Sequence, residues 1–206
     1  MQVNDLDYFA FSYIKMDIDG ICSYLKSPLN MISGQLTMKN ANVIDILKVK
    51  TSNSIVSLQE HRTKTDIACI YQYNKFGCIF ISNINDGWAS LVHMISVNNK
   101  SESYFFILDK EKKYINNINL FSFENGSEER IVRTMVDGGK WVFYDNGPLQ
   151  WFESPEYYER KIIRKRMNYL IVWEYCKKIG IDLENDLFFY PQTKVAVFER
   201  KKRRSY

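Results

Sequence analysis

Runs of apolar and β-forming residues separated by polar turns predict β-strands along much of this chain. Aromatic and aliphatic residues are dense from Tyr8 to Ile14, and such residues fit the half-buried surface of a sheet. The same residue types fill Ile67–Tyr73 and Cys78–Ile84 on either side of the turn at 74–77, which predicts a hairpin. Weaker strand patterns occupy four further segments: Val43–Val49, Ser54–Leu58, Leu187–Tyr190 and Lys194–Glu199.

Glycine-containing turns divide the middle of the chain into a predicted antiparallel meander. These turns are Asn125-Gly126, Asp137-Gly138-Gly139 and Asn146-Gly147-Pro148, and dipeptides of this kind favour tight connections between strands. The strands expected around these turns are Ser103–Leu108, Ile118–Glu124, Glu129–Val136, Lys140–Tyr144 and Leu149–Phe152.

Two short helices are predicted in the first half of the chain. Asp17 or Asp19 is suited to cap a helix that runs to about Lys26. A second helix is expected from Trp88 to Val97, where apolar residues recur at the spacing of one helical face.

A long C-terminal amphipathic helix is predicted from Ser154 to about Ile179. Ser154-Pro155-Glu156 is a strong helix start, and Gly180 follows as a stop. On a helical wheel the two faces differ in polarity. One is apolar (Tyr158, Ile162, Tyr169, Trp173, Cys176) and the other is basic (Arg160, Lys161, Arg164, Lys165, Lys178). Arg166 falls beside the apolar face, so we expect it to pair with a carboxylate, with Glu153 and Glu124 as candidates.

The order of these elements predicts an α+β fold. Neighbouring strands pair locally and helices do not alternate regularly with strands, so the sheet should be an antiparallel meander with the long helix and one or two shorter helices packed on it. The 206 residues carry 46% apolar side chains, which suffices for one domain with a packed core. We assign residues 1–199 to this domain and 200–206 to a basic tail.

Composition favours a cytoplasmic protein. No segment approaches the run of ~18 apolar residues that a membrane span needs, and the N-terminus, with Asp5 and Asp7, does not resemble a signal peptide. The cysteines stand singly, as is typical of buried thiols in a reducing compartment. A Cys69–Cys78 disulfide across the hairpin is the alternative if the protein is secreted. The four cysteines are Cys22, Cys69, Cys78 and Cys176.

The net charge of +4 comes from the end of the chain. Five cations occupy 200–204, so the preceding residues sum to +4 − 5 = −1. Such a cluster suits either a solvated terminus or contact with nucleic acid or an acidic surface.

Candidate chemistry is sparse. His61 and His93 lie in no nucleophile motif, and we expect His61 on the surface and His93 half-buried in its helix. No phosphate-binding or dinucleotide fingerprint occurs. Three acidic groupings resemble metal ligands by type. The first lacks the remaining ligands of a calcium loop, a charged hairpin turn explains the second, and a polar loop is the ordinary explanation of the third. We therefore expect no catalytic residue, no metal site and no cofactor. The groupings are Asp17 with Asp19, Asp109 with Glu111 and Lys113, and Asp182 with Glu184 and Asp186.

Aromatic and basic side chains near the last meander turns are the best sign of a binding surface. Tyr, Trp and Arg are enriched at macromolecular interfaces because they bury large areas. Core packing is the alternative explanation for the aromatic residues. The candidate partner-binding residues are Trp141, Tyr144, Trp151, Tyr157, Arg160, Lys161, Arg164 and Lys165.

A family resemblance covers roughly residues 87–182. The chain resembles bacterial immunity proteins of polymorphic or contact-dependent growth-inhibition toxins in the order of these positions: Gly87-Trp88, Glu124-Asn125-Gly126, Glu129-Arg130, Trp141-x-Phe143, Gly147, Phe152-Glu153, Tyr158, Arg160, Ile162 and Arg166. The resemblance implies a non-enzymatic cytoplasmic protein that binds one toxin domain and blocks its active site or substrate surface. Inhibitors of nucleases are often acidic, whereas this chain is slightly basic, which argues against a nuclease target.

Two other functions remain alternatives. The first is a nucleic-acid-binding module that uses the basic helix face together with the C-terminal basic run. The second is a metal-dependent hydrolase.

Overall fold

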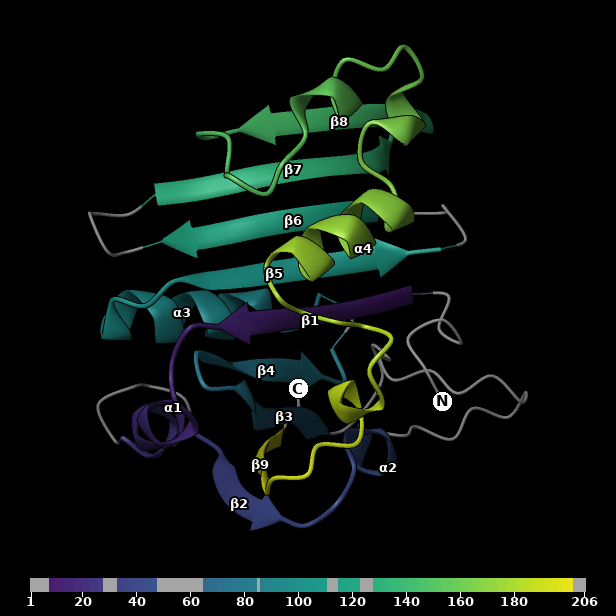
Figure 1. Cartoon of the computed structure of the whole chain (residues 1–206). Helices are drawn as coiled ribbons and strands as arrows, with labels where there is room; N and C mark the ends of the chain where they lie inside the picture. Colours follow the sequence, from purple (N-terminus) through teal and green to yellow (C-terminus); the bar gives the residue numbers. More distant parts are fainter. Residues whose placement is uncertain are drawn as a thin grey trace, which may run out of the picture.

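The protein forms one nine-stranded antiparallel sheet with helices on both faces, which confirms the α+β class (Figure 1). A computed structural model describes residues 8–27, 33–47, 65–84, 86–110, 115–122 and 128–201. The strand order is β2-β9-β3-β4-β1-β5-β6-β7-β8. The strands are β1 (Tyr8–Ile14), β2 (Gln35–Lys39), β3 (Thr65–Asn74), β4 (Gly77–Ser82), β5 (Ser103–Asp109), β6 (Ile115–Ser122), β7 (Glu128–Asp137), β8 (Lys140–Asn146) and β9 (Val195–Lys201).

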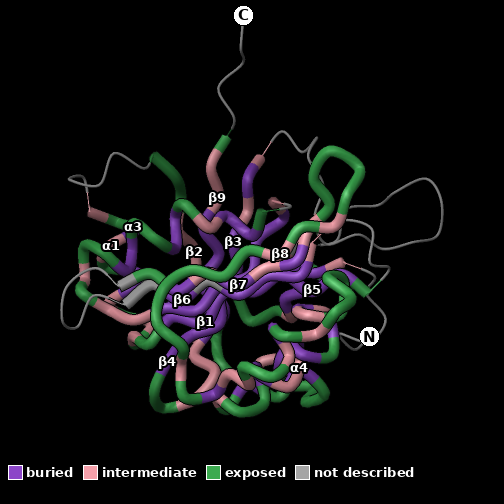
Figure 2. The backbone as a smooth tube through the Cα atoms, turned by 90° about the horizontal axis from the view of Figure 1, so that it is seen from above, coloured by how far each residue is buried: buried purple, intermediate pink, exposed green. Residues whose placement is uncertain are grey.

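Helices cover both faces of the sheet. We call the face that carries α4 the front face and the face that carries α1 and α3 the back face (Figure 1). Seen from above, the buried strands lie between these layers (Figure 2). The α-helices are α1 (Ile18–Lys26), α2 (Val43–Leu47), α3 (Ala89–Asn99) and α4 (Tyr169–Lys178), and the described 3₁₀ turns are η2 (Pro155–Tyr157), η3 (Ile163–Lys165) and η4 (Asp186–Phe188). No helix among the described residues is long and apolar enough to cross a membrane.

The central strand β1 is buried on both sides, by α3 at the back and by Phe188 and Phe189 of the η4 segment at the front. Phe9 and Phe11 join the front core, where Phe11 stacks on Phe106 with ring centroids 4.9 Å apart. Ala10 and Ile14 point to the back face and pack in the cores on that side. Successive side chains of a strand point to opposite faces, so a doubly covered strand requires a nearly continuous apolar run, which the buried Ser12 interrupts here.

Local sequence signals predicted several elements correctly. Asp17 caps α1, because its Oδ1 accepts a hydrogen bond from the Gly20 amide at 2.7 Å. The β3–β4 hairpin, the helix after Trp88 and the meander of β5 to β8 are also confirmed.

The prediction of a long C-terminal helix is wrong. The segment from Ser154 to Ile179 instead contains η2, η3 and the ten-residue α4, separated by turns. Ser154 forms no side-chain cap, and the helix begins only after Asn168, whose Oδ1 accepts from the Ile171 amide at 3.2 Å.

Charge and side-chain shape explain the break. In a continuous helix, Arg160 would face Arg164, and Lys161 would face Lys165, at the i,i+4 spacing where like charges destabilise. The β-branched pair Ile162-Ile163 lowers helix propensity further. The broken path leaves Ile162 47% exposed, although the helical wheel placed it on the apolar face.

Three strand predictions are also wrong. Residues 43–47 form α2, whose first turn is held by the Asn42 side chain accepting from the Asp45 amide at 2.8 Å. The Leu187–Tyr190 segment contains η4, where Asn185 accepts from the Leu187 amide. Residues 149–152 form a loop, and the structure adds the unpredicted strand β2. The Ser54–Leu58 segment lies outside the described residues.

The register of the hairpin rules out a Cys69–Cys78 disulfide. Cys69 pairs with Ile81 and Cys78 with Gln72, and the two thiols belong to cores on opposite faces of the sheet. All four cysteines are buried and free.

The basic tail begins later than expected. Arg200 and Lys201 lie in β9, where Lys201 pairs with Thr65 and the Arg200 guanidinium donates to Asp66 Oδ2 at 2.7 Å. The folded chain therefore extends through Lys201, and residues 202–206 lie outside the described part.

Candidate partner-binding surface

A buried arginine, Arg130, binds the segment that follows β8 to the front face of the sheet. Arg130 projects from β7, and its side chain is 1% exposed. Its Nε and Nη2 donate to the two carboxylate oxygens of Glu153 at 2.9 and 2.6 Å, and Nη1 donates to the Gly147 carbonyl at 2.9 Å and also contacts Asp145. Burial alone would lower the pKa of Arg130, but the bonds to Glu153 and Asp145 raise it. The two carboxylates therefore offset the cost of burying this cation.

Tyr158 closes this network and sets where the chain turns. Its hydroxyl donates to Glu153 Oε2 at 2.6 Å, and its ring lies 5.9 Å from the Arg130 guanidinium. Burial, together with the bond to Glu153, raises the Tyr158 pKa. Because Tyr158 points into the core, its neighbours Tyr157 and Arg160 lie near the surface.

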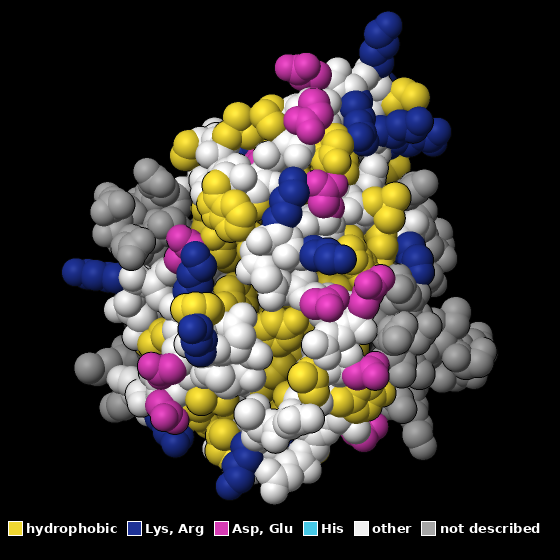
Figure 3. Space-filling view, viewed as in Figure 1, with side chains coloured by type: hydrophobic (Ala, Val, Ile, Leu, Met, Phe, Trp, Pro, Cys, Tyr) yellow, Lys and Arg dark blue, Asp and Glu magenta, His cyan; other side chains and the backbone are white. Residues whose placement is uncertain are grey.

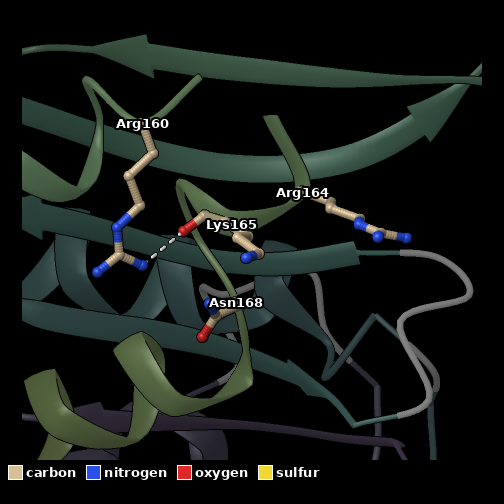
Figure 4. A pocket seen from close by; sticks show the side chains of 4 residues that line it. All are labelled: Arg160, Arg164, Lys165 and Asn168. Carbon is tan, nitrogen blue, oxygen red and sulfur yellow. Dashed lines mark hydrogen bonds between the residues drawn. The ribbon is translucent and has the colours of Figure 1, made fainter. Parts of the chain in front are cut away.

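Arg160 is held in place from two sides. Its guanidinium lies 4.3 Å from the centroid of the Tyr157 ring, and its Nη1 donates to the Lys165 carbonyl at 3.0 Å (Figure 4). Tyr157 is itself fixed, because its hydroxyl donates to Glu174 Oε2 at 2.7 Å. The arginine is therefore oriented by contacts within the chain.

A hollow of about 250 Å³ lies beside Arg160, lined also by Arg164, Lys165 and Asn168. Arg160 and Arg164 point to different sides of it (Figure 4). Asn168 contributes from the start of α4, where its Oδ1 is engaged by the Ile171 amide.

Exposed apolar side chains flank these cations. Ile163 is 36% exposed and Leu170 is 74% exposed. Figure 3 shows Lys and Arg side chains gathered next to hydrophobic ones at the upper right of the front face. We call this surface the Arg160 patch and define it as Tyr157, Arg160, Lys161, Ile162, Ile163, Arg164, Lys165, Asn168 and Leu170.

Two contacts attach the patch to the sheet below it. Arg166 Nε donates to the Arg160 carbonyl at 2.8 Å, and the Arg166 guanidinium lies 5.4 Å from the Phe143 ring centroid. The Met167 amide donates to Thr134 Oγ1 at 3.1 Å. The expected ion pair of Arg166 with Glu153 is therefore wrong, because Arg130 occupies that carboxylate. The other candidate, Glu124, lies outside the described residues.

The predicted binding residues do not form one surface. Tyr157, Arg160, Lys161, Arg164 and Lys165 lie in the Arg160 patch. Trp141 is half-buried on β8. Tyr144 faces the back of the sheet, since its neighbour Phe143 packs on Tyr158 at the front, and it lies 5.0 Å from the Arg133 guanidinium.

Trp151 belongs to a second hollow of about 540 Å³ near the C-terminal end of α4. It is 73% exposed, and Phe76 in the β3–β4 turn is 66% exposed. Sequence reasoning missed this site, although an aromatic residue in a tight polar turn was a signal for it. The lining residues are Tyr13, Lys15, Asn74, Phe76, Trp151, Lys178, Ile179 and Gly180.

The remaining chemical candidates have structural roles where the structure describes them. Asp182 Oδ1 accepts from the Glu184 amide at 3.0 Å, and Asp109 Oδ2 accepts from the Ile115 amide at 3.2 Å. In the described part of the chain, no three His, Cys, Asp or Glu residues are grouped to hold a metal ion. His93 is exposed and not half-buried as expected. His61, Glu111 and Lys113 lie outside the described residues.

Comparison with known proteins adds no relative. Neither protein-family models, nor curated proteins, nor solved structures gave a match to this chain.

Proposed function

We propose that the protein is a non-enzymatic binding protein that recognises another protein through the Arg160 patch. The observation that carries this proposal is the orientation of Arg160 by Tyr157 and Lys165 beside a hollow. Ile163 and Leu170, each within two residues of a lining residue in the sequence, are exposed apolar side chains. Interfaces are built from such combinations of arginine, tyrosine and apolar side chains. A side chain that is already ordered loses less entropy on binding.

The partner in this proposal is a bacterial toxin domain, which the protein neutralises in the cytoplasm as an immunity protein. This part rests on the sequence resemblance, which spans the strands and turns that carry the patch. By covering the toxin's active site or substrate surface, the bound protein would act by exclusion and would need no chemistry of its own.

The nucleic-acid alternative required two basic segments on one surface. The sheet order separates β8, beside the Arg160 patch, from β9, which leads to the C-terminal run, by seven strand spacings. At roughly 4.8 Å per spacing this amounts to about 34 Å. Arg200 is also already paired with Asp66. This separation disfavours a single phosphate-binding stripe.

Coexpression with the toxin encoded by the neighbouring gene, followed by a pull-down, tests the proposal. We expect a stable complex with the wild-type chain and a loss of about 100-fold or more in affinity for Arg160→Glu/Arg164→Glu, because two attractive charges become repulsive. Lys100→Glu/Lys194→Glu carries the same charge change on exposed residues outside the patch and should bind normally. No complex, or equal weakening by both pairs, would refute the proposal.

A further inference from the structure

The hollow in the Arg160 patch is lined by side chains that can donate hydrogen bonds. A guanidinium carries five N–H groups, and for Arg160 the structure shows one hydrogen bond, to the Lys165 carbonyl. Asn168 uses its Oδ1 to cap α4, which leaves its amide nitrogen as a further donor on the lining. The lining therefore offers several hydrogen-bond donors to a ligand.

The cations that line the hollow form no direct salt bridge within the described chain, although the Glu174 carboxylate attracts Arg160 from beyond the Tyr157 ring. Elsewhere Arg130, Lys178 and Arg200 each form an ion pair with a carboxylate. Among the described residues no such pair engages Arg160, Arg164 or Lys165. An anion bound beside these cations would gain a favourable charge interaction with them.

From these observations we infer that the hollow is an oxyanion site, which receives two carboxylate side chains from an acidic segment of the protein partner. This inference rests on the proposed function for the class of partner. Arginine matches a carboxylate with two parallel hydrogen bonds. Because Arg160 and Arg164 point to different sides of the hollow (Figure 4), they suit two carboxylates on one segment better than one compact phosphate.

The charge of the whole chain agrees with a carboxylate ligand. A nucleic-acid surface needs basic side chains that follow many phosphates, whereas the residues before 200 sum to −1. A single local group of cations instead matches a local acidic patch on a protein.

The test is an NMR titration of the full chain with a hexaglutamate peptide as probe. The side-chain Nε–Hε signal of Arg160 and the side-chain amide signal of Asn168 should shift and saturate at millimolar peptide. The variant Arg160→Gln/Arg164→Gln should bind at least about tenfold more weakly. The matched variant Lys100→Gln/Lys194→Gln removes the same charge from outside the patch and should bind like the wild type.

Parallel titrations with inorganic phosphate and with a twelve-nucleotide single-stranded DNA decide the chemical class. Tighter binding of either probe than of hexaglutamate at the same signals would overturn the carboxylate assignment. Absence of shifts with the peptide, or equal weakening by the two variants, would overturn the site itself. If Arg160→Gln/Arg164→Gln does not fold, the wild-type shifts decide alone.

These outcomes are distinct from those of the pull-down. A toxin complex that survives Arg160→Gln/Arg164→Gln would leave the immunity function standing and remove the oxyanion site. Peptide binding at Arg160 without any toxin complex would do the reverse.

Discussion

At the scale of single residues, Arg130 decides the path of the chain after the meander. It joins β7 to Glu153 and to the Gly147 carbonyl, and this contact bends residues 149–152 into a loop where a strand was predicted. The sequence shows an arginine and a glutamate 23 positions apart, but it does not indicate which of several cations takes that carboxylate. Arg166 had the same charge and a plausible position, and it was the wrong choice.

Replacing this arginine tests its role. Arg130→Met should lower the free energy of unfolding by about 3–5 kcal/mol, because Glu153, with a side chain 2% exposed, would lose its buried cation. Urea unfolding measures the change. Arg130→Met/Glu153→Gln should recover part of the loss, since it removes the unpaired charge. Unfolding of Arg130→Met at the wild-type urea concentration would contradict this assignment.

At the scale of elements, the sequence predicted best where the signal was local. The cap at Asp17, the Gly-Gly turn at 138–139 and the helical spacing after Trp88 each act over a few residues, and each was confirmed. The prediction failed for residues 154–179. It gave more weight to the helix-start signal at Ser154 than to the like charges at 160–165, which disfavour a continuous helix. It also failed at Val43, where β-branched residues form a helix that is buried against β3.

Asn168 links the start of α4 to the binding surface, and two substitutions separate its roles. Asn168→Ala removes the cap and should cost about 1 kcal/mol of stability. Asn168→Asp keeps a capping oxygen and should unfold close to the wild type.

For peptide binding, the ranking of the two variants should be the reverse of their ranking in stability. Asn168→Asp places a negative charge in the lining of the hollow and should lower the affinity for hexaglutamate more than Asn168→Ala does. Urea unfolding and the NMR titration give the two readouts. Equal peptide affinity for Asn168→Asp and wild type would show that Asn168 does not line an anion site.

At the scale of the whole molecule, the meander from β5 to β8 followed from its turns, but the complete sheet did not. β1 pairs with β4 and β5, and β9 inserts between β2 and β3. Such pairings join residues far apart in the sequence and depend on packing of the whole core, which no local pattern encodes. Of the predicted binding residues, the broken path of residues 154–168 groups Tyr157 with the cations of 160–165, while Tyr144 and Trp151 lie elsewhere.

Hydrogen–deuterium exchange of the complex with the coexpressed toxin domain tests the central claim most directly. The account predicts slower amide exchange on binding across residues 157–170, with little change at β9 and at Tyr144 on the back face. Slower exchange confined to β9, to the back face or to the Phe76–Trp151 hollow, with residues 157–170 unchanged, would contradict it.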